Sequence, residues 1–212
     1  MERLINLKNC KDYQKLRYPA KIVKNGGIVV FPTETVYGIG SNGLDKEAVE
    51  RLYKIKERPL NKPISLLVSD FEMIEKVAKD ISETEYKIMK KFFPGPLTII
   101  LNKKDIVPNI LTSGGSTVGI RMPEDEITRK LIEYAGVPIA ASSANISGRS
   151  SGIDIQDIIK EFGDKIDYYI DGGKCKIGIG STIVKVENNT IKILREGSVS
   201  KEEIENAINN TY

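Results

Sequence analysis

The sequence predicts an α/β protein with a mixed sheet. Short runs of β-branched and apolar residues alternate with segments of helical periodicity, which is typical of α/β domains. Near the end of the chain, Thr182–Val186 and Thr190–Leu194 alternate around Asn188-Asn189, a signal of an antiparallel hairpin. Such a hairpin beside strands that are joined by helices makes the sheet mixed rather than purely parallel. The 212 residues can bury one sizeable core, so we expect a single domain over residues 1–212.

Capping and helix-breaking residues set the elements of the first half of the chain. A helix near Tyr13–Lys24 should end at Gly26-Gly27, with Pro19 either kinking it or marking its true start. Asp45 can cap a second helix, which must end before Pro59. The remaining pattern predicts strands at Ile28–Phe31 and Ile64–Val68, and helices near Phe71–Ala78 and Glu83–Phe92.

In the second half of the chain, strands and helices continue to alternate. The pattern predicts strands at Leu97–Leu101, Thr117–Met122, Pro138–Ala141 and Tyr168–Ile170, and helices at Glu126–Tyr134 and Ile155–Phe162. Ser200 and Glu203 have the spacing of a capping box, which predicts a last helix directly after Ser200.

The composition excludes several kinds of catalysis. The chain has no histidine, which excludes Ser-His-Asp and Cys-His nucleophiles, histidine-ligated metals and imidazole acid-base chemistry. Catalysis must then come from positioned Lys and Arg side chains, hydroxyls, amides and backbone groups, a set that suits phosphoryl or nucleotidyl transfer. The two cysteines, Cys10 and Cys175, lie far apart and predict neither a disulfide framework nor a zinc site.

Hydropathy and charge predict where the protein is located and which partners it can contact. No apolar stretch approaches membrane-spanning length, and the first residues lack a secretory apolar core, so we expect a cytoplasmic protein without a membrane partner. The net charge of +3 permits contact with nucleic acid without arguing for it.

The segment Asn25–Gly40 is the clearest candidate for a ligand site. An apolar run ends at Pro32 and is followed by the hydroxyl groups of Thr33, Thr35 and Tyr37, and the glycines after them let a ligand approach the backbone closely. Such a segment is typical of the floor of a small-molecule site. The alternative is an edge strand followed by a turn.

A cluster of cations follows the second predicted helix: Lys54, Lys56, Arg58 and Lys62. A basic helix end complements the helix dipole, and this alone explains Lys54. Because prolines fix the loop that carries the other three, we favour anion binding there.

Hydroxyl-rich loops and two arginines complete the set of candidate binding groups. The loops Ser142–Gly148, Gly114–Thr117 and Gly178–Thr182 lie next to predicted strands, and the first of them opens at a carboxyl end, where α/β sheets tend to bind ligands. Arg121 and Arg195 sit on or at the end of strands, where each either pairs with a carboxylate or clamps a substrate anion. None of the loops is a Walker A loop or a dinucleotide fingerprint.

Taken in order, these segments carry a family resemblance. The pattern consists of Asn25–Gly40, Lys56-x-Arg58-Pro59, Pro94–Thr98, Val118–Pro123, Ser143-Ala144-Asn145-x-Ser147-Gly148, Gly180-Ser181-Thr182 and Leu194-Arg195-x-Gly197. No single segment is specific, but their order and spacing leave little room for chance. The chain resembles the YrdC-like family of threonylcarbamoyl-AMP synthases over nearly its whole length.

The resemblance implies a fold and an activity. The fold is a twisted open mixed sheet flanked by helices, with a concave basic face that holds the active site. The activity joins L-threonine, bicarbonate or CO2, and ATP, accompanied by Mg2+, into threonylcarbamoyl-adenylate with release of pyrophosphate. A separate transferase then uses the product to modify an adenosine beside the tRNA anticodon. Long-form relatives carry an extra C-terminal domain, and the chain is similar to the short form.

The resemblance also assigns roles by position. The Lys-x-Arg and Ser-x-Asn pattern forms the core of the ATP and transfer site and falls on Lys56, Arg58, Ser143 and Asn145. Threonine recognition falls on Thr35, Arg121 and Ser181, with Arg121 the natural partner of the carboxylate. Nucleotide contacts fall on Arg58, Lys62, Thr117, Ala141, Ser143 and Arg195.

Two positions depart from the long-form pattern, and two other functions stay open. Lys62 stands where an asparagine often lies, and Leu67 stands where a histidine can help to hold threonine. A non-catalytic module that binds double-stranded RNA or the ribosome would use the same basic face with little need for the hydroxyl loops. Direct binding of tRNA or double-stranded RNA by the chain also stays open. The second alternative is adenylate chemistry on a different carbamate, as in carbamoyl transfer for hydrogenase maturation.

Overall fold

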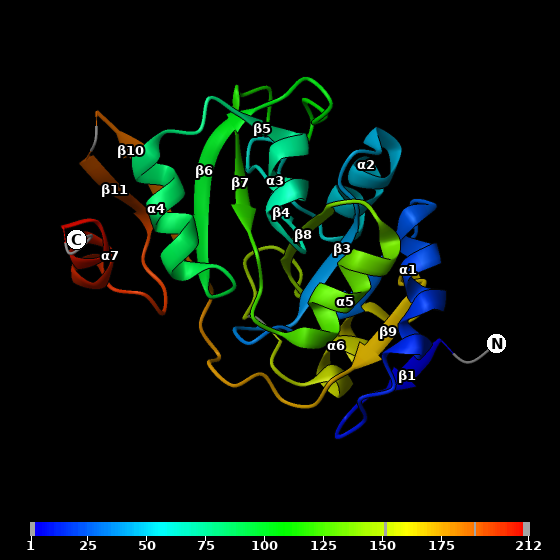
Figure 1. The fold of residues 1–212 in the computed structure, drawn as a ribbon. Helices are drawn as coiled ribbons and strands as arrows, with labels where there is room; N and C mark the ends of the chain where they lie inside the picture. Colours follow the sequence, from blue (N-terminus) through cyan, green and yellow to red (C-terminus); the bar gives the residue numbers. More distant parts are fainter. Residues whose placement is uncertain (1–2, 151, 189, 210–212) are drawn as a thin grey trace.

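The chain forms a long twisted sheet with helices on both faces, as a computed structural model of residues 3–150, 152–188 and 190–209 shows (Figure 1). The strands are β1 (Leu4–Asn6), β2 (Val29–Phe31), β3 (Gly38–Asn42), β4 (Ser65–Leu67), β5 (Ala78–Lys79), β6 (Leu97–Lys103), β7 (Thr117–Arg121), β8 (Ile139–Ser143), β9 (Tyr168–Asp171), β10 (Thr182–Glu187) and β11 (Thr190–Arg195). Their order across the sheet is β1-β9-β2-β3-β8-β4-β7-β6-β10-β11, and β5 pairs with β6 off this path.

The sheet is mixed, as the sequence predicts. Parallel pairs join β1 with β9, β9 with β2, β4 with β7, and β6 with β10. Antiparallel pairs join β2 with β3, β3 with β8, β8 with β4, β7 with β6, and β10 with β11. The β10–β11 pair is the predicted hairpin; Asn188 lies in its turn, and Asn189 lies outside the described residues.

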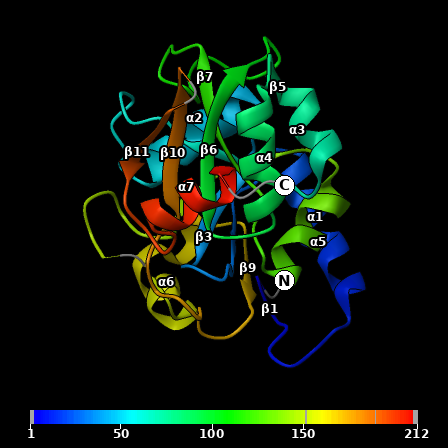
Figure 2. The same cartoon turned by 60° about the vertical axis from the view of Figure 1, so that its left-hand side comes forward.

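Helices cover both faces of this sheet. They are α1 (Arg17–Lys24), α2 (Lys46–Ile55), α3 (Phe71–Val77), α4 (Glu83–Phe92), α5 (Glu126–Ala135), α6 (Ile155–Phe162) and α7 (Lys201–Asn209), with 3-10 turns at Tyr13–Leu16 and Gly163–Lys165. Figures 1 and 2 place α1, α3, α4 and α5 on one face and α2 and α6 on the other. None of these described helices is long and apolar enough to cross a membrane.

Side-chain caps begin most of the helices. Asp45 accepts hydrogen bonds from the backbone N–H groups of Glu47 and Ala48, which are the free donors of the first turn of α2. Ser200 and Glu203 form the predicted capping box before α7. These local hydrogen bonds explain why helix starts could be placed from the sequence.

The first predicted helix divides into two parts. Tyr13–Leu16 is a 3-10 turn, and α1 begins only at Arg17, so Pro19 lies in the first turn of the helix. A backbone N–H in the first turn has no acceptor within the helix, and a proline there costs no hydrogen bond. The helix therefore starts near Pro19, as one of the two alternatives predicts, but its first residue is Arg17.

Several strands were absent from the prediction or shorter in it. The strands β1, β3 and β5 were not predicted, and β8 continues through Ser142 and Ser143 instead of ending at Ala141. The strand β3 begins with Gly-Ile-Gly, whose glycines disfavour a strand prediction. The close approach of the neighbouring strand explains the glycine at position 40. A Cβ atom on Gly40 would lie 2.5 Å from the carbonyl oxygen of Ala140. Close packing between strands, which a local pattern does not show, selects glycine here.

Candidate functional site

Polar residues gather in one cavity where several strand ends meet the loop between β2 and β3. We call this the strand-end cavity. Strands β7, β8 and β11 end at it, β10 begins at it, and the loop that follows α2 closes one side. Of the residues predicted for the site, those that line the strand-end cavity are Thr35, Arg58, Arg121, Ala141, Ser143, Ser181 and Arg195.

Four predicted site residues are not among those that line the cavity: Lys56, Lys62, Thr117 and Asn145. Thr117 is the first residue of β7 and Arg121 the last, which separates them by roughly 13 Å along the strand. Lys62 is exposed, and its carbonyl oxygen accepts hydrogen bonds from Arg58 and from the Tyr53 hydroxyl.

Lys56 is buried and holds the loop that begins at Ser143. Its side chain is 1% exposed, and its Nζ lies 2.6 Å from the carbonyl oxygens of both Ser143 and Asn145. Burial, together with the charge of Arg58, lowers the pKa of Lys56 to about 7. The Asn145 amide group in turn donates to the carbonyl oxygens of Ile146 and Arg149. These two residues shape the wall of the cavity from behind.

Arg58 fixes the loop after α2 while it lines the cavity. Its Nε donates to the carbonyl oxygen of Lys62 at 2.9 Å, and its Nη2 donates to that of Pro63 at 2.8 Å. Burial lowers the pKa of Arg58 from its usual value, and nearby Tyr53 opposes this change. The guanidinium group is thus held in place by neutral carbonyl groups.

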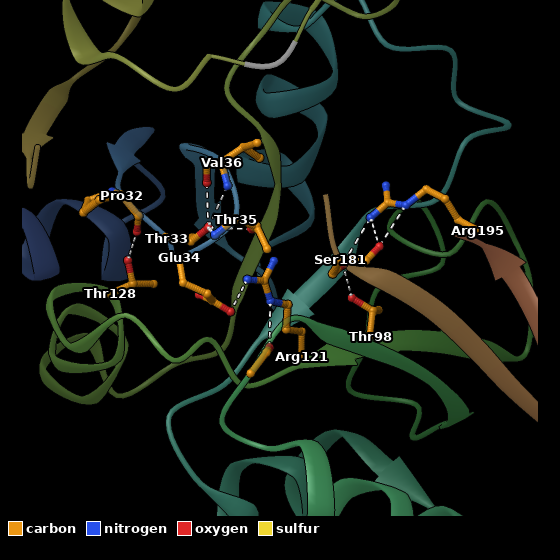
Figure 3. A network of polar contacts seen from close by, with 11 residues as sticks. Pro32, Thr33, Glu34, Thr35, Val36, Thr98, Arg121, Thr128, Ser181 and Arg195 are labelled. Carbon is orange, nitrogen blue, oxygen red and sulfur yellow. Dashed lines mark hydrogen bonds and ion pairs between the residues drawn. The ribbon is translucent and has the colours of Figure 1, made fainter. Parts of the chain in front are cut away.

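Arg121 forms a buried ion pair. Its Nη2 lies 2.6 Å from Glu34 Oε1, and its Nε donates to the carbonyl oxygen of Gly95 at 3.2 Å (Figure 3). The side chains of Arg121 and Glu34 are 9% and 6% exposed. The second carboxylate oxygen of Glu34, Oε2, is buried and has no hydrogen-bond partner in the described part of the chain. Of the two sequence alternatives for Arg121, pairing with a carboxylate is present in the structure.

Arg195 and Ser181 form a second polar group on the opposite side. The Nε and Nη2 atoms of Arg195 donate to the Ser181 carbonyl oxygen at 3.1 and 2.7 Å, and Nη2 also reaches the Ser181 hydroxyl at 3.1 Å. That hydroxyl lies 2.8 Å from the hydroxyl of Thr98 (Figure 3). Burial and the nearby charges of Arg121 and Arg58 lower the pKa of Arg195.

The electrostatic balance of the cavity is positive. Arg58, Arg121 and Arg195 all line it, and its lining within the described residues includes no aspartate or glutamate. Glu34 compensates the charge of Arg121 from behind, which leaves two guanidinium groups bonded to neutral oxygens. Such an arrangement attracts anions, and a guanidinium fork matches phosphate and carboxylate oxygens.

The same residues do not form a metal site of their own. Across residues 3–150, 152–188 and 190–209, no group of three or more His, Cys, Asp or Glu side chains could hold a metal ion. Hydroxyl and guanidinium groups line the cavity, and guanidinium groups cannot act as ligands.

Sequence reasoning missed Glu34 and Thr98, which are in contact with the predicted residues Arg121 and Ser181. It named the hydroxyl of Thr33 without giving it a role, and Thr33 lines the cavity next to Thr35. All three lie within motifs that the sequence analysis quotes, so their positions carried a signal. Their partners, however, are 87 and 83 residues away along the chain for Glu34 and Thr98.

Known proteins resemble this chain closely. The profile of the Sua5/YciO/YrdC family, described as "Telomere recombination", matches residues 21–197. The threonylcarbamoyl-AMP synthase of Pyrococcus abyssi is 42% identical over 208 residues, which cover 98% of this chain and 61% of that protein. A putative threonylcarbamoyl-AMP synthase of Methanocaldococcus jannaschii is 45% identical over 184 residues, which cover 87% of this chain and 86% of that protein.

A solved structure confirms the fold. The crystal structure of P. abyssi Sua5 complexed with L-threonine matches with a TM-score of 0.94 and 42% identity, covering 97% of this chain and 60% of that one. The chain therefore spans about 60% of the length of the P. abyssi protein. Its flanked, twisted mixed sheet is the fold that the motifs indicate; the basic character of the concave face stays a prediction. By profile, sequence and fold, the chain belongs to the Sua5/YciO/YrdC family.

Proposed function

We propose that the chain makes L-threonylcarbamoyl-AMP and pyrophosphate from L-threonine, bicarbonate or CO2, and ATP. The observation that carries this proposal is the division of the strand-end cavity. Arg58 and Arg195 offer two positive charges that have no carboxylate partner within the described residues, while Thr35 and Arg121 offer a hydroxyl and a neutralised guanidinium. The hydroxyl of Ser181, which accepts from Arg195, lies between the two halves (Figure 3). The first half suits a triphosphate and the second an amino acid. The names of the P. abyssi and M. jannaschii relatives, a threonylcarbamoyl-AMP synthase and a putative one, support the same activity.

On the nucleotide side, Arg58 and Arg195 contact the phosphates. Ser143 and Ala141 lie on β8 and line the same cavity as these arginines, so they can contact the rest of the nucleotide. Lys62 and Thr117 lie outside the lining of the cavity, so their contacts with ATP require the nucleotide to extend beyond it. Lys56 and Asn145 support the reaction by holding the loop that begins at Ser143.

On the amino-acid side, Arg121 binds the threonine carboxylate. Within the described residues its hydrogen bonds use Nε and one proton of Nη2, and a guanidinium has five N–H donors, so others stay available for a substrate. Thr35 and Ser181 contact the amine or hydroxyl group of threonine. Leu67 lines the same cavity, so the position that departs from the long-form pattern faces the substrate as an apolar group.

The reaction needs alignment and charge neutralisation. The threonine amine forms a bond to the carbon of CO2 and loses a proton, which gives a carbamate. A carbamate oxygen then attacks the α-phosphorus of ATP, and the bond to the bridging oxygen of pyrophosphate breaks. Arg58 and Arg195 stabilise the charge that develops on the phosphates. Mg2+ bound to ATP would neutralise part of the phosphate charge; within the described residues no group of three or more His, Cys, Asp or Glu side chains could hold it.

The product then leaves for a second enzyme. Threonylcarbamoyl-AMP is a mixed anhydride, so it can pass its threonylcarbamoyl group to a nucleophile on another molecule. We propose that a separate transferase delivers this group to the adenosine beside the tRNA anticodon. Direct binding of tRNA by this chain is not required for its own chemistry.

Pyrophosphate release tests the proposal. The purified protein is incubated with ATP, Mg2+, bicarbonate and threonine, and each component is omitted in turn. We expect release only with all of them present, and the adenylate should be detected by mass spectrometry. Equal release without threonine or without bicarbonate would refute the activity. Tight binding of double-stranded RNA together with no adenylate would favour the RNA-binding alternative.

A further inference from the structure

Two hydroxyl groups lie side by side in the loop between β2 and β3. The Oγ1 atoms of Thr33 and Thr35 are 2.8 Å apart, and both residues line the strand-end cavity (Figure 3). Thr33 is 5% exposed and Thr35 is fully buried. At this distance two hydroxyl oxygens share one proton, so one of them is the donor and the other the acceptor.

The neighbouring backbone sets the direction of this hydrogen bond. Thr33 Oγ1 also lies 2.6 Å from the carbonyl oxygen of Val36, which can only accept. The single proton of the Thr33 hydroxyl therefore goes to Val36. The backbone N–H groups of Thr35 and Val36 lie farther from the same oxygen, at 3.2 and 3.3 Å, and share one of its two lone pairs, which leaves the other for a hydroxyl proton. The proton between the two hydroxyls must then come from Thr35.

The hydroxyl group of Thr35 therefore has only lone pairs to offer to a ligand. Its proton points to Thr33, and this is the one hydrogen bond of the Thr35 hydroxyl within the described residues. The backbone around it is held on its other side, since Ile177 N–H donates to the Glu34 carbonyl at 2.9 Å and Gly178 N–H donates to the Thr35 carbonyl at 2.8 Å. The hydroxyl is therefore fixed in place as an acceptor.

The second hydroxyl pair of the cavity has no such direction. Ser181 and Thr98 also have their oxygens 2.8 Å apart, and Ser181 accepts from Arg195. No carbonyl oxygen takes the proton of either hydroxyl in the described structure, so either can donate to the other. Of these two hydroxyl pairs, only Thr33–Thr35 has a fixed donor and a fixed acceptor.

We propose that Thr33 is a positioning residue that makes Thr35 a hydrogen-bond acceptor, and that Thr35 accepts the proton of the side-chain hydroxyl of the amino-acid substrate. This inference rests on the proposed threonine site. The substrate amine loses its charge and all but one of its N–H donors as it becomes a carbamate, whereas the side-chain hydroxyl is the same in substrate and product. An acceptor that must hold both molecules is therefore matched to the hydroxyl. A buried group of fixed polarity rejects ligands that leave it unpaired.

The experiment compares two ligands that differ in one proton. Calorimetry measures the affinity of each variant for L-threonine and for its 3-fluoro analogue, in which fluorine replaces the hydroxyl group and offers no proton. The ratio of the two affinities reports the polarity of Thr35 and does not depend on turnover. For the wild type we expect threonine to bind more tightly by on the order of a hundredfold or more.

Three variants separate polarity from structural support. Thr33→Val frees the Thr35 proton, so the preference for threonine should fall by about tenfold, because Thr35 can then donate as well as accept. Thr33→Ser keeps the hydroxyl and should keep the wild-type ratio. Thr128→Val is the matched control: the Thr128 hydroxyl donates to the Pro32 carbonyl in the same loop without touching Thr35 (Figure 3). Its loss should leave the ratio unchanged.

The outcomes distinguish the inference from the proposed function. An unchanged ratio in a folded Thr33→Val protein, with adenylate made by the wild type, overturns the inference alone. A wild type that neither binds threonine nor makes adenylate overturns both. Melting curves show whether Thr33→Val folds; if it does not, a wild-type ratio near one still overturns the inference, and a ratio that falls in Thr35→Val supports it.

Discussion

The two sides of the strand-end cavity treat the charge of an arginine differently. On one side, the buried guanidinium of Arg121 lies 2.6 Å from the carboxylate of Glu34. On the other side, Arg58 and Arg195 donate to main-chain carbonyl oxygens and to the hydroxyl of Ser181. A carboxylate cancels a positive charge, whereas a carbonyl group orients it and leaves it in place.

This difference separates two kinds of anion. A triphosphate carries several negative charges and gains most where two guanidinium groups are uncompensated. Under the proposed function, the single carboxylate of an amino acid binds at Arg121, where the negative charge of Glu34 disfavours an anion of high charge. The internal carboxylate would then sort the substrates between the two halves. Four measurements can break or sharpen this comparison.

The largest expected effect is a loss of stability when the carboxylate of Glu34 is removed. Glu34→Gln leaves the buried Arg121 charge without its partner, and such a change costs about 3–5 kcal/mol in the free energy of unfolding. Denaturant unfolding measures this loss. Glu133→Gln is the matched control, because Glu133 pairs with Lys130 at the exposed surface, where the cost should stay below about 1 kcal/mol. Equal stability of the two variants would show that Glu34 does not compensate Arg121.

The next effect concerns the uncompensated side. Arg58→Ala should lower kcat/KM for adenylate formation by about a hundredfold or more, equal to about 2.7 kcal/mol, because the phosphates lose a positioned charge. Lys54→Ala removes the same charge from an exposed position of α2 and should leave the activity unchanged. If RNA is bound, each variant should reduce the salt slope by about one. Intact synthesis with lost RNA binding would reverse the proposed function.

A smaller effect, on the threonine requirement, is expected on the side of Arg121, whose charge is paired with Glu34. Arg121→Lys keeps the charge but loses the planar fork, so the threonine concentration needed for half-maximal rate should rise by about tenfold, or about 1.4 kcal/mol. The ATP requirement should change little. Threonine and ATP titrations, run with melting curves, measure this for Arg121→Lys and for Ser181→Ala. An unaltered threonine requirement in both folded variants would remove these residues from the amino-acid site.

The smallest effect is a pH dependence of the free energy of unfolding, which comes from the buried amine of Lys56. Burial lowers the pKa of Lys56 from 10.5 to about 7, so between pH 7 and 10.5 the unfolded chain binds a proton that the folded chain lacks. The contribution of Lys56 to the free energy of unfolding should therefore rise with pH in this window, by about 1 kcal/mol from pH 7 to pH 8.

Comparison with Lys56→Met isolates this contribution, since all other groups titrate in both proteins. The difference in unfolding free energy, wild type minus variant, should increase between pH 7 and pH 8. A difference that stays constant over this range would mean that Lys56 keeps its proton in the folded protein.

Local patterns were enough to predict most of the fold. Helix starts at Asp45 and Ser200 follow from hydrogen bonds within one turn, and the β10–β11 hairpin follows from alternation around a short turn. The motifs also predicted the family, which the comparisons confirm. These features depend on residues a few positions apart, and the sequence shows such spacings directly.

Only the tertiary structure decided the partners of the site residues. The strand β3 depends on Gly40 fitting against Ala140, Lys56 is drawn to carbonyl oxygens 87 and 89 residues away, and Glu34 meets Arg121 across the same distance of 87 residues. Side chains of this kind are satisfied by whichever buried group the sheet brings close, and no local pattern encodes that choice. The sequence by itself determined the chemical groups of the cavity, and the packing of the strands determined which of their charges and protons face it.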